Sequence, residues 1–217
     1  MKTHKSAGTC EVCNGILKRF TFINGNELEY CEKCSEVRDK EFLDEQIKRE
    51  EAAKRMYLYD NIPSMYSNED FGPPEENEMK NRSVLIYGEF GTGKTFRAYG
   101  IAKNLYYTEV IRSFKVERAF RMMMNIKNSF KNDNYEKIFK SYTATGLLVI
   151  DEWGKNTGTE FEESVLFEIV NTRYENLRET IIIINAKDKV ELARLMRPDV
   201  LDRFRGGLIE INGKSRR

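Results

Sequence analysis

A glycine-rich octapeptide in the middle of the chain has the composition of a phosphate-binding loop. Residues 88–95 read GEFGTGKT, which matches the pattern G-x-x-x-x-G-K-[ST]. Gly88, Gly91 and Gly93 allow backbone N–H groups to turn inward on phosphate oxygens. Lys94 adds a positive charge there, and the hydroxyl of Thr95 can bind Mg²⁺. The pattern predicts a site for ATP and Mg²⁺ that consists of Gly88, Glu89, Phe90, Gly91, Thr92, Gly93, Lys94 and Thr95.

Two further apolar runs, both expected to be strands, are each followed directly by polar residues. Asp151 and Glu152 end the run LLVI at 147–150, and Asn185 ends the run TIIII at 180–184. Asp151 can hold the magnesium shell, while Glu152 can polarise an attacking water. A nucleotide kinase has no need of this acidic pair. The amide of Asn185 can orient the water or sense the γ-phosphate, although a strand-ending asparagine is also an ordinary turn residue. We predict Lys94, Asp151, Glu152 and Asn185 as catalytic residues.

Arg203, in the stretch LMRPDVLDRFRGG at 195–207, is the candidate for a charge that acts on another subunit. It follows the fourth predicted strand and lies distal to the chain's own phosphate loop. We therefore predict an arginine finger that stabilises transition-state charge on the ATP of a neighbouring subunit. Such a head-to-tail contact builds rings or helical filaments. The alternative is a surface arginine at a helix end, with Arg205 pointing to a different side.

All four cysteines lie within the first 34 residues as two CxxC pairs, Cys10/Cys13 and Cys31/Cys34. Two such pairs, 17 residues apart, can wrap four thiolates tetrahedrally around zinc. A hairpin with its turn at 24–26 and with Phe20, Phe22 and Ile23 fits between them. Two disulfides are disfavoured in a reducing cytosol, and a thioredoxin-type redox pair needs a single CxxC in a βαβ context. The single histidine, His4, is expected in a tail.

Composition indicates a globular chain with segregated charge. The formal net charge is +1, but residues 36–78 hold 13 acidic against 6 basic residues, and residues 112–140 hold 8 basic against 3 acidic residues. The basic segment is a candidate face for single-stranded DNA, although a solvated helix surface explains the same charges. No apolar run is long enough for a membrane span or a signal peptide, so we expect a cytoplasmic protein with no membrane partner.

Candidate DNA contacts in the basic segment combine cations with aromatic rings. Backbone contacts and base stacking would come from Arg112, Lys115, Arg118, Arg121, Lys127, Lys131, Phe120 and Phe130. The alternative places the aromatics and residues 122–124 in the core, and we favour that alternative for Phe120.

The elements that must position these residues alternate between strands and helices, which predicts an α/β fold with a parallel sheet covered on both faces. Strands are expected at 83–87, 108–114, 146–151, 180–185 and 207–211, with helices at about 94–105, 116–143 (two) and 164–177. Residues 36–60 carry acid–base pairs at i,i+4 and predict an exposed helix, and 61–78 predicts an extended linker. We divide the chain into a zinc-binding module (1–37), a charged helix with linker (38–78) and an ATPase domain (79–217).

From about residue 61 onward the chain resembles the DnaC/DnaI/IstB-like branch of the AAA+ ATPases. The resemblance rests on NIPSMY…F, YGEFGTGKT, LLVIDEWG, NTRYENLRETIIIIN and VLDRFRGG. It implies a sheet of order 5-1-4-3-2, single-stranded DNA binding in a helical assembly, Walker A and B motifs at 88–95 and 151–152, sensor 1 at Asn185 and the arginine finger at Arg203. The ending GKSRR implies a sensor-2 arginine at Arg217, although Arg216 stands where the family has an aromatic residue.

The zinc module ahead of this core is most similar to replicative helicase loaders. This similarity implies an ATP-dependent protein that loads a replicative DNA helicase onto single-stranded DNA, with ATP, Mg²⁺ and Zn²⁺ bound. Two alternatives stay open. One is an IstB-like transposition helper ATPase, which has the same core. The other is a zinc adaptor that uses ATP as a binding switch with negligible turnover.

Overall fold

The computed structural model describes residues 3–21, 27–67, 83–154 and 158–213, which fall into two compact units, Met1–Tyr57 and Leu58–Arg217. None of the helices in these ranges is long and apolar enough to cross a membrane. The predicted three-part division is finer than this and stays a prediction. Its second boundary, at residue 78, lies outside the described residues.

The first unit holds a three-stranded antiparallel sheet of order β1-β2-β3 and most of a long helix. The strands are β1 (Thr3–Thr9), β2 (Ile16–Thr21) and β3 (Glu27–Cys31). The hairpin predicted between the two CxxC pairs is confirmed as β2 and β3, while its expected turn and Phe22 and Ile23 lie outside the described residues. The expected tail at His4 is wrong, because His4 lies in β1 opposite Arg19.

Helix α1 (Glu32–Asn61) confirms the charged helix predicted at 36–60. The pair Glu45–Arg49 closes to 3.6 Å on its surface. Apolar side chains on the part of this helix that belongs to the first unit are exposed, among them Phe42 at 64%, whereas Leu58 near its end is buried. The helix is thus stabilised by local sequence rather than by a buried stripe. After it, residues 64–67 form the short helix α2 (Ser64–Ser67), where an extended linker was expected.

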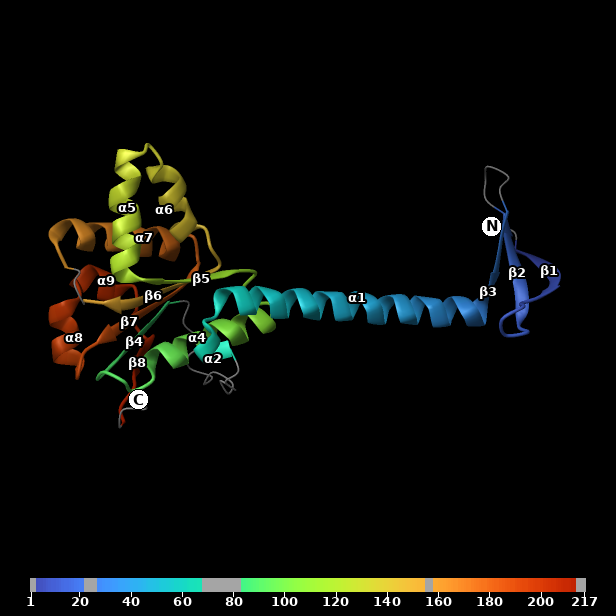
Figure 1. Ribbon diagram of the computed structural model, residues 1–217, viewed down its shortest axis with the longest axis horizontal. Coiled ribbons are helices and arrows are strands. Elements are labelled where there is room, and N and C mark those ends of the chain that lie inside the picture. The colour runs from blue at the N-terminus through green and yellow to red at the C-terminus, as the bar shows by residue number, and fades with distance from the viewer. Residues whose placement is uncertain (1–2, 22–26, 68–82, 155–157, 214–217) are drawn as a thin grey trace. The chain divides into compact units, whose positions relative to one another are not determined.

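The second unit is built on a five-stranded parallel sheet of order β5-β6-β7-β4-β8 (Figure 1). If the five strands are numbered 1 to 5 along the chain, from β4 to β8, and the sheet is read from β8 to β5, the order is 5-1-4-3-2. This order confirms the predicted topology. The strands are β4 (Ser83–Gly88), β5 (Phe114–Arg118), β6 (Leu147–Trp153), β7 (Glu179–Asn185) and β8 (Leu208–Glu210). The three inner strands are buried on both faces, which is why their sequences read as unbroken apolar runs.

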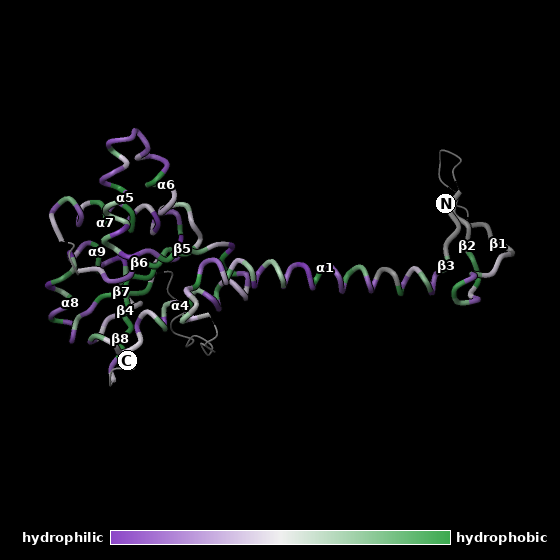
Figure 2. The backbone as a smooth tube through the Cα atoms, viewed as in Figure 1, coloured by the Kyte–Doolittle hydropathy of each residue, from purple (hydrophilic) through white to green (hydrophobic). Residues whose placement is uncertain are grey.

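Helices cover both faces of this sheet. Helix α4 (Lys94–Tyr107) packs on one face, against β4, β6 and β7. The other face is covered by α5 (Ala119–Lys131), α6 (Tyr135–Thr143), α7 (Glu160–Glu175) and α9 (Pro198–Asp202), with α8 (Lys189–Leu195) beside them (Figure 1). Right-handed crossovers produce this split, because the β4-to-β5 connection crosses the sheet in the opposite direction from the later ones. Hydrophobic residues concentrate along the central strands (Figure 2).

One predicted strand is displaced. The strand expected at 108–114 begins only at Phe114, because the preceding residues end α4 in a series of turns. The N–H of Thr108 donates to Asn104, Glu109 has a left-handed φ of 60°, and the N–H of Ile111 donates back to Leu105. The β-branched composition of this stretch suits a strand, but the helix end takes its backbone donors first.

Candidate phosphate-binding and cysteine sites

The loop between β4 and α4 has the backbone that its glycines allow. Gly88, Gly91 and Gly93 have φ values of 150°, 80° and 97°, which disfavour side chains. A Cβ atom at Gly88 would lie 2.2 Å from the carbonyl oxygen of Ile211, so no other residue fits there. This loop follows the buried strand and opens the helix, as predicted for residues 88–95.

The ammonium of Lys94 is held at the mouth of the loop. Its Nζ donates to the carbonyl oxygens of Gly88 at 2.9 Å and Glu89 at 2.6 Å, and the residue is 5% exposed. The hydroxyl of Thr92 donates to Glu89 at 2.9 Å and braces the same turn, whereas Phe90 projects outward at 70% exposure. The loop therefore fixes a desolvated positive charge where a phosphate would need one.

Thr95, in the first turn of α4, lies beside Asp151, near the carboxyl end of β6. The Thr95 hydroxyl lies 3.2 Å from Oδ2 and 3.4 Å from Oδ1 of Asp151. Burial raises the pKa of Asp151, against hydrogen bonds from the Glu152 N–H and Thr95 that lower it. A hydroxyl and a desolvated carboxylate next to a phosphate loop are the hard oxygen ligands that Mg²⁺ prefers, so these residues fit that ion.

Glu152 sits on a backbone irregularity. The register of β6 against β7 shifts between Ile150 and Trp153, and Glu152 within this bulge has a left-handed φ of 58°. A bulge turns a side chain away from the alternation of the strand. The carboxylate of Glu152 lies 3.9 Å from Nε of Arg118, the residue that ends β5. Holding a non-glycine residue in this conformation costs about 1–2 kcal/mol, as is usual at functional sites.

Asn185 lies beside the loop. It pairs in register with Gly88 across the neighbouring strands β7 and β4. The structure thus brings Lys94, Asp151, Glu152 and Asn185 together at the carboxyl end of one sheet.

Arg203 lies elsewhere. It follows α9 and precedes the amino end of β8, which runs parallel to β4, so it and its own phosphate loop flank opposite ends of the sheet. Its Nε and Nη2 donate to Oδ1 of Asn171 at 3.1 and 2.9 Å, and its Cζ lies 5.0 Å from the centre of the Tyr174 ring. The chain thus does not bring this arginine to its own phosphate loop. Arg217 lies outside the described residues.

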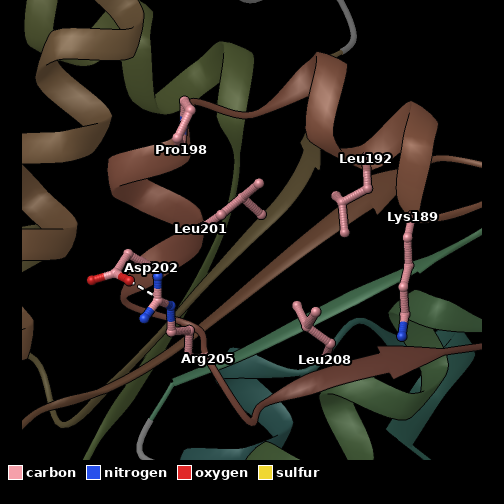
Figure 3. Close-up of a pocket in the computed structure, with 7 residues that line it drawn as sticks. All are labelled: Lys189, Leu192, Pro198, Leu201, Asp202, Arg205 and Leu208. Atoms are coloured by element: carbon pink, nitrogen blue, oxygen red, sulfur yellow. Dashed lines mark ion pairs between the residues drawn. The ribbon is translucent and has the colours of Figure 1, made fainter.

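Arg205 points to a different side. Its Nε contacts Asp202 at 2.6 Å, and it lines a groove of about 300 Å³ with Leu192, Leu201 and Leu208 (Figure 3). This groove lies between α8, α9 and β8, away from the phosphate loop.

Four thiols gather in the first unit. The Sγ atoms of Cys10, Cys13, Cys31 and Cys34 all lie within 4.8 Å of one another. Cys10 and Cys31 are buried, and a Cβ atom at Gly15 would lie 3.1 Å from the sulfur of Cys13. Cys10 and Cys13 flank a turn after β1, whereas Cys31 ends β3 and Cys34 lies in the first turn of α1. The four sulfurs match the ligand set of a structural zinc site.

The basic segment forms part of β5 and the helices α5 and α6. Several of its cations contact this chain: Lys127 binds Glu162 at 2.7 Å, Lys115 lies 3.9 Å from the Tyr142 ring centre, and Arg121 lies 3.7 Å from Glu117. Phe130 stacks on Tyr135 with ring centres 4.6 Å apart.

The core position expected for Phe120 is wrong. The side chain of Phe120 is 55% exposed and that of Met124 is 40% exposed, whereas Met122 and Met123 are buried. Helix α5 faces the sheet with Ala119, Met122, Met123 and Ile126, so Phe120, Met124 and Lys131 fall on its outer side.

Sequence reasoning missed the buried polar residues of α7. Arg173 is fully buried and donates to carbonyl oxygens of Tyr142, Thr143, Thr145, Gly146 and Glu179 and to the Thr180 hydroxyl. Burial lowers the pKa of Arg173 to about 9, which leaves it protonated at neutral pH. One signal in the sequence could have revealed this burial: Arg173 falls on the same helix face as the apolar residues Leu166, Ile169 and Val170. Asn171 and Tyr174, which contact Arg203, flank it and gave no such signal.

Known proteins share this core. A family model described as IstB-like ATP binding protein matches residues 77–215. The replicative helicase loader DnaC of Escherichia coli (strain K12) is 29% identical over 61% of this chain and 54% of its own length. The replicative helicase loader DnaI of Bacillus subtilis (strain 168) is 24% identical over 95% of this chain and 76% of its own length. The chain therefore spans about half the length of the DnaC loaders that it matches.

Solved structures agree on the fold. The crystal structure of the DnaC helicase loader superimposes with a TM-score of 0.55 at 20% identity, covering 76% of this chain and 89% of the other. The replication initiator DnaA bound to AMPPCP and single-stranded DNA gives 0.57 at 21% identity, covering 70% and 51%. With the family model matched over more than half of its length, the chain belongs to the IstB-like ATP binding proteins, on the AAA+ branch that includes the DnaC and DnaI helicase loaders.

Proposed function

We propose that this chain is a Mg²⁺-dependent ATPase that loads a replicative helicase onto single-stranded DNA. The observation that carries the proposal is the match to DnaI over 95% of the chain, which takes in the cysteine unit as well as the core. The family model covers only residues 77–215, a core that loaders and transposition helpers have in common. A helicase partner on DNA would place the chain in the cytoplasm of a bacterium.

The residues around the phosphate loop take these roles. Residues 88–95 bind the ATP phosphates, with Lys94 at the β- and γ-phosphates, and Thr95 and Asp151 hold Mg²⁺. The ion would neutralise the developing charge on the phosphoryl group. Glu152 orients and polarises the attacking water, and Asn185 hydrogen bonds to the water or the γ-phosphate. The support is geometric, since all five side chains lie at the carboxyl end of the same sheet.

Arg203 serves the neighbouring subunit. A head-to-tail assembly would bring it to the next nucleotide, where its charge stabilises the transition state. Its position near the amino end of β8 supports this role. Assembly on DNA would then activate hydrolysis, because each site is complete only with its neighbour.

Single-stranded DNA is assigned to the outer face of α5. Phe120 and Met124 offer apolar surface and Lys131 a cation on one helix face, which suits base stacking and phosphate contacts. Lys127 is a poor probe of DNA binding, because its ammonium also stabilises Glu162.

The decisive test is a pull-down with the host's replicative helicase, combined with ATP hydrolysis measured with and without single-stranded DNA. We expect the helicase to be retained and DNA to raise hydrolysis, with Lys94→Ala as the inactive control. No retention of the helicase, with hydrolysis still raised by DNA, would favour the transposition helper. ATP binding without turnover in either condition would favour the zinc adaptor.

A further inference from the structure

We infer that Asn171 and Tyr174 of α7 are positioning residues for Arg203, and that they fix its guanidinium for action on the nucleotide of a neighbouring subunit. The inference rests on the arginine-finger role proposed above. It adds two residues, and a physical reason for them, to a site that otherwise ends at Arg203.

Asn171 and Tyr174 fix the guanidinium in two different ways. Both Nε and Nη2 of Arg203 donate to the single oxygen Oδ1 of Asn171, at 3.1 and 2.9 Å, which sets the direction of the planar group. The ring of Tyr174, 5.0 Å from Cζ, lies against that group and restrains its plane. An arginine side chain has about 2 kcal/mol of rotamer entropy to lose, so ordering it before assembly leaves less to lose at the transition state.

A third residue orients the asparagine. The Nδ2 group of Asn171 donates to Oε1 of Glu175 at 2.8 Å, one helical turn along α7. The amide therefore presents its oxygen, and not its nitrogen, to Arg203. The relay from Glu175 through Asn171 explains how an uncharged side chain can hold a cation in one direction.

The neutral acceptor matters because it holds Nε and Nη2 without compensating the positive charge that the finger must present to phosphate. A carboxylate in the place of Asn171 would pair with the guanidinium and compete with phosphate. Asp202 lies near Nη1 at 3.4 Å, but its other oxygen is engaged by Arg205 at 2.6 Å. These contacts use three of the five N–H donors of a guanidinium, so two donors can address phosphate oxygens.

The test compares ATP turnover of full-length chains assembled on single-stranded DNA. Asn171→Ala should lower kcat roughly 10- to 100-fold with the KM for ATP unchanged, because the chain's own phosphate loop is untouched. The double variant Asn171→Ala/Arg203→Ala should be no slower than Arg203→Ala alone, since Asn171 acts only through Arg203. Tyr174→Phe keeps the ring and should retain turnover, while Tyr174→Ala should lose part of it.

Asn176→Ala is the matched control. This asparagine ends the same helix, donates to the Thr172 carbonyl oxygen and makes no described contact with Arg203. Wild-type kcat in Asn171→Ala, or additive losses in the double variant, while Arg203→Ala alone shows reduced but measurable turnover, would overturn the role of Asn171 alone. Wild-type turnover in Arg203→Ala would instead overturn the finger, and the inference with it.

Discussion

Four thiols show what single residues contribute to this molecule. A small unit with three short strands has little core of its own, and its sulfurs converge to within 4.8 Å. If the four thiols bind a metal, its coordination would be the main source of folding free energy for this unit. The spacing alone predicted this convergence, because a CxxC turn brings its two sulfurs together and a hairpin joins the two turns.

We expect one zinc ion per chain, and we expect Cys31→Ser to unfold the first unit while ATP binding persists. The second unit has its own sheet and hydrophobic core, so loss of metal from the first unit should not unfold it. Elemental analysis of protein purified without chelator gives the metal content, and fluorescent-nucleotide titration gives the ATP affinity. Less than half an equivalent of metal with reactive thiols, or loss of ATP binding in Cys31→Ser, would contradict this.

At the scale of elements, the beginning of α7 combines a helix cap with an ion pair in which the carboxylate is buried and the ammonium is partly exposed. Thr159 accepts from the N–H of Glu162, and Glu162 accepts from the N–H of Thr159. Glu162 also binds Lys127 of α5 at 2.7 Å. Burial alone would raise the pKa of Glu162, but the hydrogen bonds from Lys127 and Thr159 outweigh it and lower the pKa to about 2. The cap thus ties α7 to α5.

Glu162→Gln should lower the free energy of unfolding of the second unit, Leu58–Arg217, by about 1–3 kcal/mol at pH 7. A carboxylate whose pKa is lower in the folded state contributes stability above its unfolded pKa and loses it as pH falls through the folded value. The contribution should therefore disappear between about pH 4.5 and pH 2. Urea unfolding of both proteins across this range checks the sign, with Glu160→Gln, exposed in the same first turn, as the control. A difference that stays constant with pH would contradict the assignment.

The same scale shows which features sequence can predict. Strands β4, β6 and β7 were predictable because burial on both faces demands continuous apolar residues. Strand β5 begins later than predicted because residues 108–113 form the turns that end α4. The β-branched composition of this stretch does not reveal that helix-end turns compete with a strand there. The exposure of Phe120 and the burial of Arg173 depend on which helix face meets the sheet, which only tertiary packing decides. Roles for Asn171 and Tyr174 required contacts across elements that local pattern does not encode.

At the scale of the whole molecule, the proposed role of Arg203 would make ATP hydrolysis a property of an assembly. Each chain offers a phosphate loop at the carboxyl end of its sheet and an ordered arginine near the other end. A head-to-tail contact that repeats this pairing is heterologous and builds a ring or a helical filament. In the proposed assembly, catalytic competence would require two chains, one that supplies Glu152 and one that supplies Arg203.

Mixing two inactive variants tests this arrangement. Arg203→Ala should bind ATP but hydrolyse it poorly, and Glu152→Gln should bind ATP without turnover while keeping its finger. In an equal mixture that assembles at random on single-stranded DNA, about a quarter of the interfaces join an intact Glu152 to an intact Arg203 and should regain activity. Arg205→Ala removes an ion pair with Asp202 and no described contact with the phosphate loop, so it should keep most of its turnover, with any loss coming from closer pairing of Asp202 with Arg203. An arginine that acts within its own chain cannot be rescued in this way, so persistent inactivity of mixtures that fold and assemble would rule out action in trans.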